Sequence, residues 1–137
     1  MDEAKKLAVQ SWLVKAERDL ASADCLAAAP KPLLDTAIYH CQQAAEKALK
    51  GFLVYHDSRI HKTHDLGILI ADSSAFTTKY AAFADAAERL TQYAMLFRYP
   101  GTQLEPDPTE YKQAFHDASE FIRITLALIP VEAHPGE

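Results

Sequence analysis

Cysteine is scarce in this chain, with Cys25 and Cys41 as the two examples among 137 residues. Both lie at or beside apolar positions of predicted helices, so the sequence predicts two buried free thiols and no disulfide framework. Free thiols suit a reducing compartment, and we therefore expect a cytoplasmic protein. A chain of this length buries a sizeable core as one domain without needing disulfides or a metal.

Long apolar runs are also missing. No stretch approaches the roughly 18 consecutive apolar residues of a membrane span, which argues against membrane association. The opening MDEAKKLAVQSW has neither the apolar run nor the cleavage-site pattern of a signal peptide. The alternation of apolar and polar residues that is typical of strands is absent too, so we expect no sheet.

Positive charge is in short supply, because the net charge is −5. This balance argues against a broad nucleic-acid-binding surface, which rests on many cationic contacts. The positive charge is nevertheless concentrated in residues 39–64, which hold four of the six histidines and only two acidic residues. The four cationic residues in this stretch are Lys47, Lys50, Arg59 and Lys62. The composition thus leaves room for a local basic pocket.

The sequence does contain four stripes of apolar residues spaced alternately by four and three positions, the pattern of amphipathic helices in a bundle. They occupy residues 9–27, 34–55, 76–97 and 111–129. The stretch HDLGILIAD at 64–72 adds one short helix between the second and third long helices. We therefore expect an all-α, up-and-down four-helix bundle with one additional short helix.

The breaks between the stripes agree with this fold. The sequence PKP at 30–32 ends the first helix and leaves a short connection, so the first two helices should lie antiparallel. Asp107 and Pro108 suit the cap and first position of the last helix. We expect one domain over residues 1–130 and a loose tail over residues 131–137.

The second predicted helix carries an unusual polar face. On a helical wheel, His40, Gln43, Lys47 and Lys50 fall within an arc of about 80°, separate from the apolar arc. One interpretation is a solvated helix face. The other is a ligand site, in which lysines hold phosphate while Gln and His supply hydrogen bonds to a base or ribose. Spacing alone does not separate the two.

Three pieces of sequence occur in an order that resembles the HEPN family (higher eukaryotes and prokaryotes nucleotide-binding domains). They are AIYHCQQAAEKALKGFL at 37–53, HDLGIL at 64–69 and YAMLFRYPG at 93–101. The resemblance spans nearly the whole chain. It implies an all-α up-and-down bundle, frequent homodimers, binding of nucleotides or RNA, and in many members a nucleotidyltransferase partner in a toxin–antitoxin pair.

On this resemblance, His64, Arg98 and Tyr99 join the polar arc to line a nucleotide-binding cleft. Arg98 would clamp phosphate and Tyr99 would stack on a base, whereas the structural interpretation has Tyr99 packing the end of the bundle. His64 either points toward His40 and Lys47 or serves the start of the short helix.

Catalytic HEPN members share an Arg followed after four to six residues by a His, and the resemblance implies that they cleave RNA without a metal. This sequence departs from that pattern, because Arg98 is followed by Tyr-Pro-Gly and the next histidine is His116. Arg59 and His64 match the spacing but lie in a predicted loop. They are weak candidates for catalytic residues, and enzyme activity stays open.

The predicted loop before the short helix also holds potential metal ligands, namely Asp57, His61, His64 and Asp65. Because a closed set of four ligands is not evident and cysteine is absent there, we expect no metal and no cofactor. One other observation bears on partners. Trp12 and Leu26 widen the apolar face of the first helix, which suits a dimer or partner contact.

The sequence therefore predicts a protein that binds a nucleotide or RNA, forms a homodimer and acts with a nucleotidyltransferase-like partner. Two alternatives stay open. One is a metal-independent ribonuclease, and the other is a structural bundle whose polar face contacts another protein and holds no ligand.

Overall fold

The computed structural model describes residues 1–101 and 103–136, and every regular element in those ranges is helical. The α-helices are α1 (Glu3–Ala27), α2 (Leu34–Tyr55), α3 (Leu66–Ser73), α4 (Ala84–Thr91) and α5 (Pro108–Leu128). Short 3₁₀ helices span Lys79–Phe83, Gln92–Ala94 and Val131–Ala133. The predicted all-α fold is confirmed.

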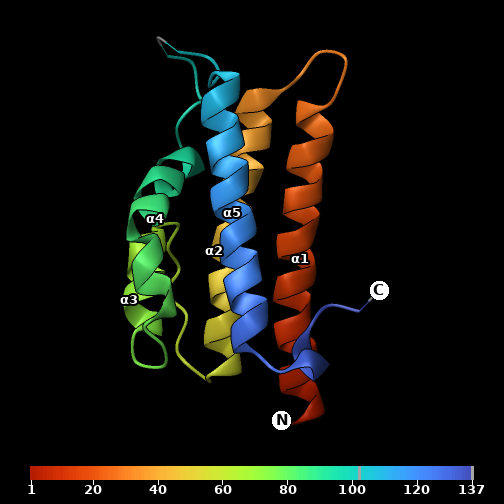
Figure 1. Ribbon diagram of the computed structural model, residues 1–137, viewed down its shortest axis with the longest axis vertical. Helices are drawn as coiled ribbons and strands as arrows, with labels where there is room; N and C mark the ends of the chain where they lie inside the picture. The colour runs from red at the N-terminus through yellow and green to blue at the C-terminus, as the bar shows by residue number, and fades with distance from the viewer. Residues whose placement is uncertain (102, 137) are drawn as a thin grey trace.

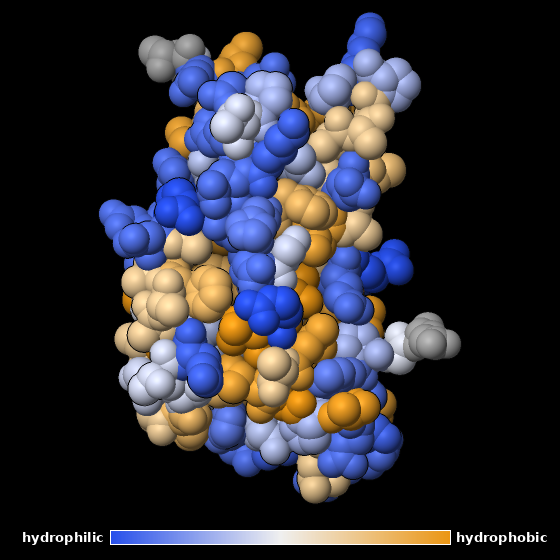
Figure 2. Space-filling view, viewed as in Figure 1, coloured by the Kyte–Doolittle hydropathy of each residue, from blue (hydrophilic) through white to orange (hydrophobic). Residues whose placement is uncertain are grey.

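The three long helices lie side by side, with α3 and α4 on the side away from α1 (Figure 1). Helix α2 is the central element, because it contacts α1, α3, α4 and α5. Its wheel is therefore buried almost all round, including polar residues of the predicted arc such as Gln43 and Lys50. By contrast, polar side chains cover much of the face of α5 that Figure 2 shows.

Gly51 lies where α1 and α2 approach closely. A Cβ atom at this position would lie 3.2 Å from Leu13 Cδ2 and 3.3 Å from Trp12 Cβ. Glycine normally weakens a helix interior, but here the missing side chain lets the two backbones pack closely. The close packing also brings Lys50, at the C-terminal end of the predicted polar arc, beside Trp12 of α1.

Local capping signals were read correctly from the sequence. The Asp107 carboxylate accepts a hydrogen bond from Glu110 N at 2.9 Å, and Pro108 occupies the first turn. The Asp65 carboxylate likewise caps α3 by accepting from Gly67 N at 2.8 Å. In both cases an acceptor satisfies an N–H group that has no partner within its helix.

The third predicted long helix, residues 76–97, is not continuous. It consists of a 3₁₀ helix, the two turns of α4 and a second 3₁₀ helix. Thr77 Oγ1 accepts from Lys79 N and fixes a turn before the first segment, while Phe97, three residues after the last segment, has a left-handed φ of 69°. The stripe still predicted the core correctly at most positions, since Tyr80 and Leu90 are buried, but Phe76 is exposed.

The tail beyond Pro130 is packed against α1, contrary to the expected loose segment. Gln10 Nε2 donates to the carbonyl oxygens of Glu132 and His134, and Ala133 is fully buried. His134 Nε2 lies 2.7 Å from Leu126 O, near the end of α5. The two Gln10 contacts connect residues 122 and 124 positions apart, so no local pattern could predict them.

The expectation of two buried thiols was wrong for one of them. Cys41 is buried, whereas Cys25 is exposed. Ala23 and Ala27 belong to the apolar stripe and face the other helices. Cys25 lies two residues after Ala23, which is about 200° around the helix, so its side chain points to solvent. Adjacency to an apolar stripe is thus a poor guide to burial on a helix.

Candidate functional site

His40 and Lys47 lie about two turns apart on one side of α2, and both contact the same carboxylate on α1. Asp19 Oδ1 lies 2.8 Å from His40 Nδ1, and Asp19 Oδ2 accepts from Lys47 Nζ at 2.5 Å. Asp19 is only 8% exposed, so the attraction is poorly screened. These two predicted ligand groups are therefore held by the fold itself.

A second charged cluster lies further along α2. Glu46 Oε2 accepts from Lys50 Nζ at 3.0 Å, and Glu46 Oε1 lies 2.7 Å from His64 Nδ1. Gln42 Nε2 donates to the backbone oxygen of His64 at 3.0 Å and to Glu46 at 3.2 Å. Lys50 also lies 5.7 Å from the centre of the Trp12 ring. Gln43 donates to Gln42 and so belongs to this network.

The third group surrounds Arg98. Its guanidinium carbon lies 4.4 Å from the centre of the Tyr39 ring and 5.8 Å from that of Tyr99, which is cation–π geometry. One guanidinium nitrogen donates to Ala94 O at 2.9 Å. Tyr99 is 60% exposed, so it does not pack the end of the bundle.

An open hollow of about 310 Å³ adjoins this group. The residues that line it are Asp35, Thr36, Tyr39, His40, Phe97 and Arg98. His40 thus links the hollow to the Asp19 cluster, since one ring faces both. Of the seven predicted binding residues, the structure brings His40 and Arg98 to this hollow, with Tyr99 beside Arg98. It places Lys47 in the Asp19 cluster and Gln43, Lys50 and His64 in the Glu46 cluster.

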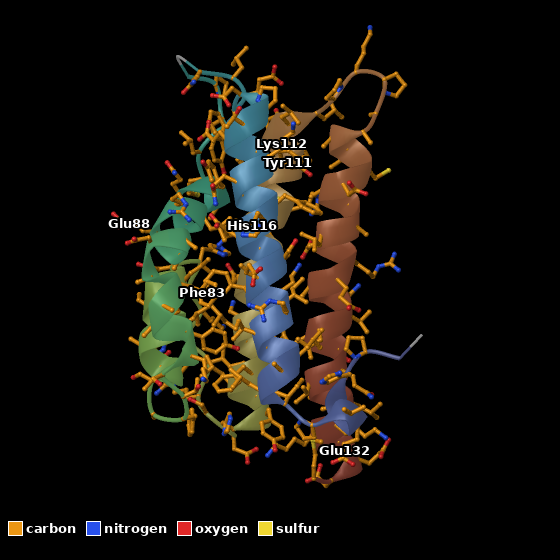
Figure 3. The ribbon with its side chains drawn as sticks, viewed as in Figure 1. Phe83, Glu88, Tyr111, Lys112, His116 and Glu132 are labelled. Carbon is orange, nitrogen blue, oxygen red and sulfur yellow. The ribbon has the colours of Figure 1, made fainter. Side chains whose placement is uncertain are left out.

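The weak catalytic pair does not form a dyad in the described residues. His64 Nδ1 is bonded to Glu46, and Arg59 is an exposed residue with no hydrogen bond to the described part of the chain. His116 lies midway along α5 on the exposed surface (Figure 3) and makes none of the contacts that would orient a general base. His61 Nδ1, a weighed metal ligand, lies 2.6 Å from Asp72 Oδ2.

Across residues 1–101 and 103–136, the structure has no group of three or more His, Cys, Asp or Glu side chains placed to hold a metal ion. The loop residues weighed as metal ligands are instead distributed among separate partners. Asp57 pairs with Lys5 at 2.9 Å, and Asp65 caps α3.

Sequence reasoning missed three residues that define these clusters: Asp19, Glu46 and Tyr39. Asp19 lies three residues after Ala16 and four before Ala23, so it falls on the buried side of α1, where a carboxylate needs a partner. Glu46 stands beside Lys47 in the sequence, so its position fits a solvated face equally well. Tyr39 gave no signal, because its role depends on a loop almost sixty residues away.

A fourth polar cluster joins α4 and α5. The Arg89 guanidinium donates to both oxygens of Asp117, at 3.0 and 3.1 Å, and this bonding raises the pKa of Arg89. Tyr93 Oη donates to Glu110 at 2.5 Å. Burial, followed by the bond to Glu110, raises the pKa of Tyr93 above its usual range. The cluster fixes α4 on α5, and it contains none of the predicted site residues.

Comparison with known proteins agrees with this architecture. The profile of the HEPN domain matches residues 9–128. The crystal structure of ST0689, an archaeal HEPN homologue, has a similar fold, with a TM-score of 0.67 at 24% sequence identity. The alignment covers 87% of this chain and 95% of that chain. A search of curated proteins found no match.

These observations define an all-helical fold of the HEPN type, built around a central α2. The chain belongs to the HEPN domain family, because the profile match extends over most of its length. Its membership supports a role related to nucleotides or RNA. Among the residues that the structure describes, no helix is both long and apolar enough to cross a membrane.

Proposed function

We propose that this protein binds a nucleotide or RNA at the hollow beside Tyr39, His40, Arg98 and Tyr99. The observation that carries the proposal is the set of contacts that the Arg98 guanidinium makes. Among the described residues it has no carboxylate partner, and two tyrosine rings flank its guanidinium. A guanidinium is suited to a phosphate group, and aromatic rings are suited to a base.

Two of the cations predicted to bind the ligand, Lys47 and Lys50, are paired within the fold, so the proposed site contains fewer free charges than the sequence suggested. Lys47 is neutralised by Asp19 and Lys50 by Glu46, so neither ammonium is free for a ligand without breaking a partly or fully buried ion pair. Binding would then rest on one guanidinium and on stacking. Stacking of a base on an aromatic side chain contributes about 1–3 kcal/mol per base.

Isothermal titration calorimetry with ATP, GTP and a short single-stranded RNA tests this function. We expect the wild type to bind at least one of them, and Arg98→Ala to weaken that binding at least tenfold. Lys112→Ala is the matched control, because Lys112 lies on the exposed face of α5 (Figure 3). Absence of binding by the wild type would refute the proposal and favour a protein-interaction bundle.

We further propose that the protein is a cytoplasmic homodimer that acts with a nucleotidyltransferase-like partner in a toxin–antitoxin-type pair. Trp12 and Leu26 are partly buried within the fold, but Leu7 and Val14 on α1 are 54% and 38% exposed and offer apolar contact area. Sedimentation of the wild type and of Leu7→Glu/Val14→Glu tests the dimer. A co-purification test with a nucleotidyltransferase domain encoded beside this gene addresses the partner.

A further inference from the structure

The ring of His64 is fixed in position and yet open to solvent. Its Nδ1 atom bonds to Glu46, and its backbone oxygen accepts from Gln42, so two α2 side chains hold the residue. The His64 side chain is nevertheless 63% exposed, whereas that of Glu46 is 5% exposed. The buried Glu46 carboxylate therefore orients the exposed His64 ring.

The carboxylate determines which ring nitrogen of His64 carries the proton. Glu46 bonds to the Lys50 ammonium, and an ionised carboxylate only accepts hydrogen bonds. Nδ1 of a neutral His64 must then donate, which leaves Nε2 as an acceptor. Within residues 1–101 and 103–136, no donor is bonded to Nε2. An acceptor of this kind pairs with a hydroxyl or amino group, not with a phosphate.

His64 and Arg98 cover the same face of α2. Tyr39, which contacts Arg98, and Glu46, which holds His64, are seven residues apart and therefore project from one side of the helix. At 1.5 Å per residue, they are separated by about 10 Å along its axis. The chain around His64 is tied to the end of α4, from which the chain leads on to Arg98, because Leu66 N donates to Thr91 Oγ1 at 3.1 Å.

The charge of this surface favours a single strand over a nucleoside triphosphate. A triphosphate would bring several negative charges to a hollow in which Arg98 is the one cationic side chain among the described residues that line it, besides His40, and Asp35 adds a carboxylate to the same lining. A phosphodiester brings one negative charge for each nucleotide, which one guanidinium can match. A strand of a few nucleotides also spans about 10 Å along the α2 axis, as the separation of Tyr39 and Glu46 requires.

We propose that His64 Nε2 accepts a hydrogen bond from a ribose 2′-hydroxyl of single-stranded RNA whose neighbouring nucleotide contacts Arg98 and the tyrosines. This inference rests on the proposed function, and it adds a residue that selects RNA over DNA. The 2′-hydroxyl is the group by which a protein distinguishes the two polymers at a given nucleotide. Glu46 acts as a positioning residue, since it sets the tautomer.

Fluorescence anisotropy with a labelled four-nucleotide RNA, the same DNA sequence and the 2′-O-methyl RNA tests this assignment at neutral pH. We expect the wild type to bind RNA about tenfold more tightly than the other two, as expected for one hydrogen bond. His64→Ala should reduce RNA affinity to that of DNA and leave DNA affinity unchanged. His61→Ala, in the same loop but bonded to Asp72, should keep the preference.

The outcomes separate this inference from the proposed function. Equal binding of RNA and DNA by the wild type, or an unchanged preference in His64→Ala, overturns the role of His64, while loss of both affinities in Arg98→Ala still supports the binding site. No binding of any strand overturns both. Nitrogen NMR of the free protein adds a direct measurement, with the proton of His64 expected on Nδ1. A proton on Nε2 would contradict the assignment.

Discussion

Glu46 and Lys50 form an ion pair that is almost closed to solvent, at 4% and 8% exposure. Removing charges from water is costly, so such a pair is a weak source of stability as a whole. It is nevertheless sensitive to the loss of one member, which leaves the other charge buried without a partner. The same holds for Asp19, whose carboxylate neutralises Lys47 and also bonds to His40.

We expect Glu46→Ala to lower the free energy of unfolding by about 3–5 kcal/mol, because the Lys50 ammonium loses its carboxylate. Urea unfolding followed by circular dichroism measures the change. Glu120→Ala is the control, since Glu120 pairs with the exposed Arg123 and its loss should cost no more than about 1 kcal/mol. The double variant Glu46→Gln/Lys50→Met should recover most of the stability. If it proves as unstable as Glu46→Ala, the buried charge is not the cause.

The two thiols should react very differently. Burial, with a smaller contribution from the charge of Asp117, raises the pKa of Cys41 from 9.0 to about 12. The thiolate fraction at pH 8 therefore falls about a thousandfold, and the thiolate is the reactive form. We expect iodoacetamide to label Cys25 in the native protein and Cys41 only after unfolding. Mass spectrometry of Cys25→Ala and Cys41→Ala assigns the sites, and rapid labelling of native Cys25→Ala would contradict the burial of Cys41.

At the scale of elements, the chain adopts the left-handed conformation just after the end of helix α2. Asp57 has a φ of 55°, and Ser58 N donates back to Leu53 O at 3.0 Å, which closes the end of the helix. Glycine is the usual residue at such a position because it has no Cβ atom to clash. The chain has an aspartate, whose carboxylate pairs with Lys5 on α1.

Asp57→Gly and Asp57→Ala both remove the pair with Lys5, so the difference between them isolates the backbone effect. We expect the glycine variant to be more stable by about 1 kcal/mol, because alanine is strained at positive φ. Thermal and urea unfolding measure this difference. Equal stability of the two variants would show that residue 57 leaves the left-handed region when the ion pair is lost.

At the scale of the whole molecule, several buried acidic groups make stability depend on alkaline pH. Burial raises the pKa of Cys41, Tyr80, Tyr93 and Tyr111 above their ordinary values of 9.0 and 10.0. The folded protein therefore keeps these protons where the unfolded chain releases them. Their contribution is complete below the ordinary pKa values and is lost as pH rises toward the raised ones.

We thus expect the urea midpoint to stay constant near neutral pH and to fall above about pH 9–10. Each group contributes a slope of at most about 1.4 kcal/mol per pH unit. Tyr80→Phe should make the fall shallower, although it costs stability at neutral pH through the lost bond with Thr125. An unchanged midpoint up to pH 11 would contradict the burial of these groups.

The sequence predicted features that depend on neighbours along the chain. The cap at Asp107 was predicted correctly, because a cap needs only a carboxylate and the N–H groups two or three residues later. The 76–97 stripe identified buried positions such as Tyr80 and Leu90 but not the breaks in the helix. Burial depends on periodicity, whereas the limits of the helical stretch depend on a threonine turn before Lys79 and on the left-handed Phe97 after Ala94.

The sequence by itself determined the all-helical fold and its apolar faces, since the repeat of apolar residues follows from the geometry of one helix. The tertiary structure alone decided which polar groups are available to a ligand. Asp19 neutralises Lys47 from 28 residues away, and Tyr39 meets Arg98 across a distance of 59 residues in the chain. Electrostatic and stacking energies depend on separation in space, and only helix packing sets that separation.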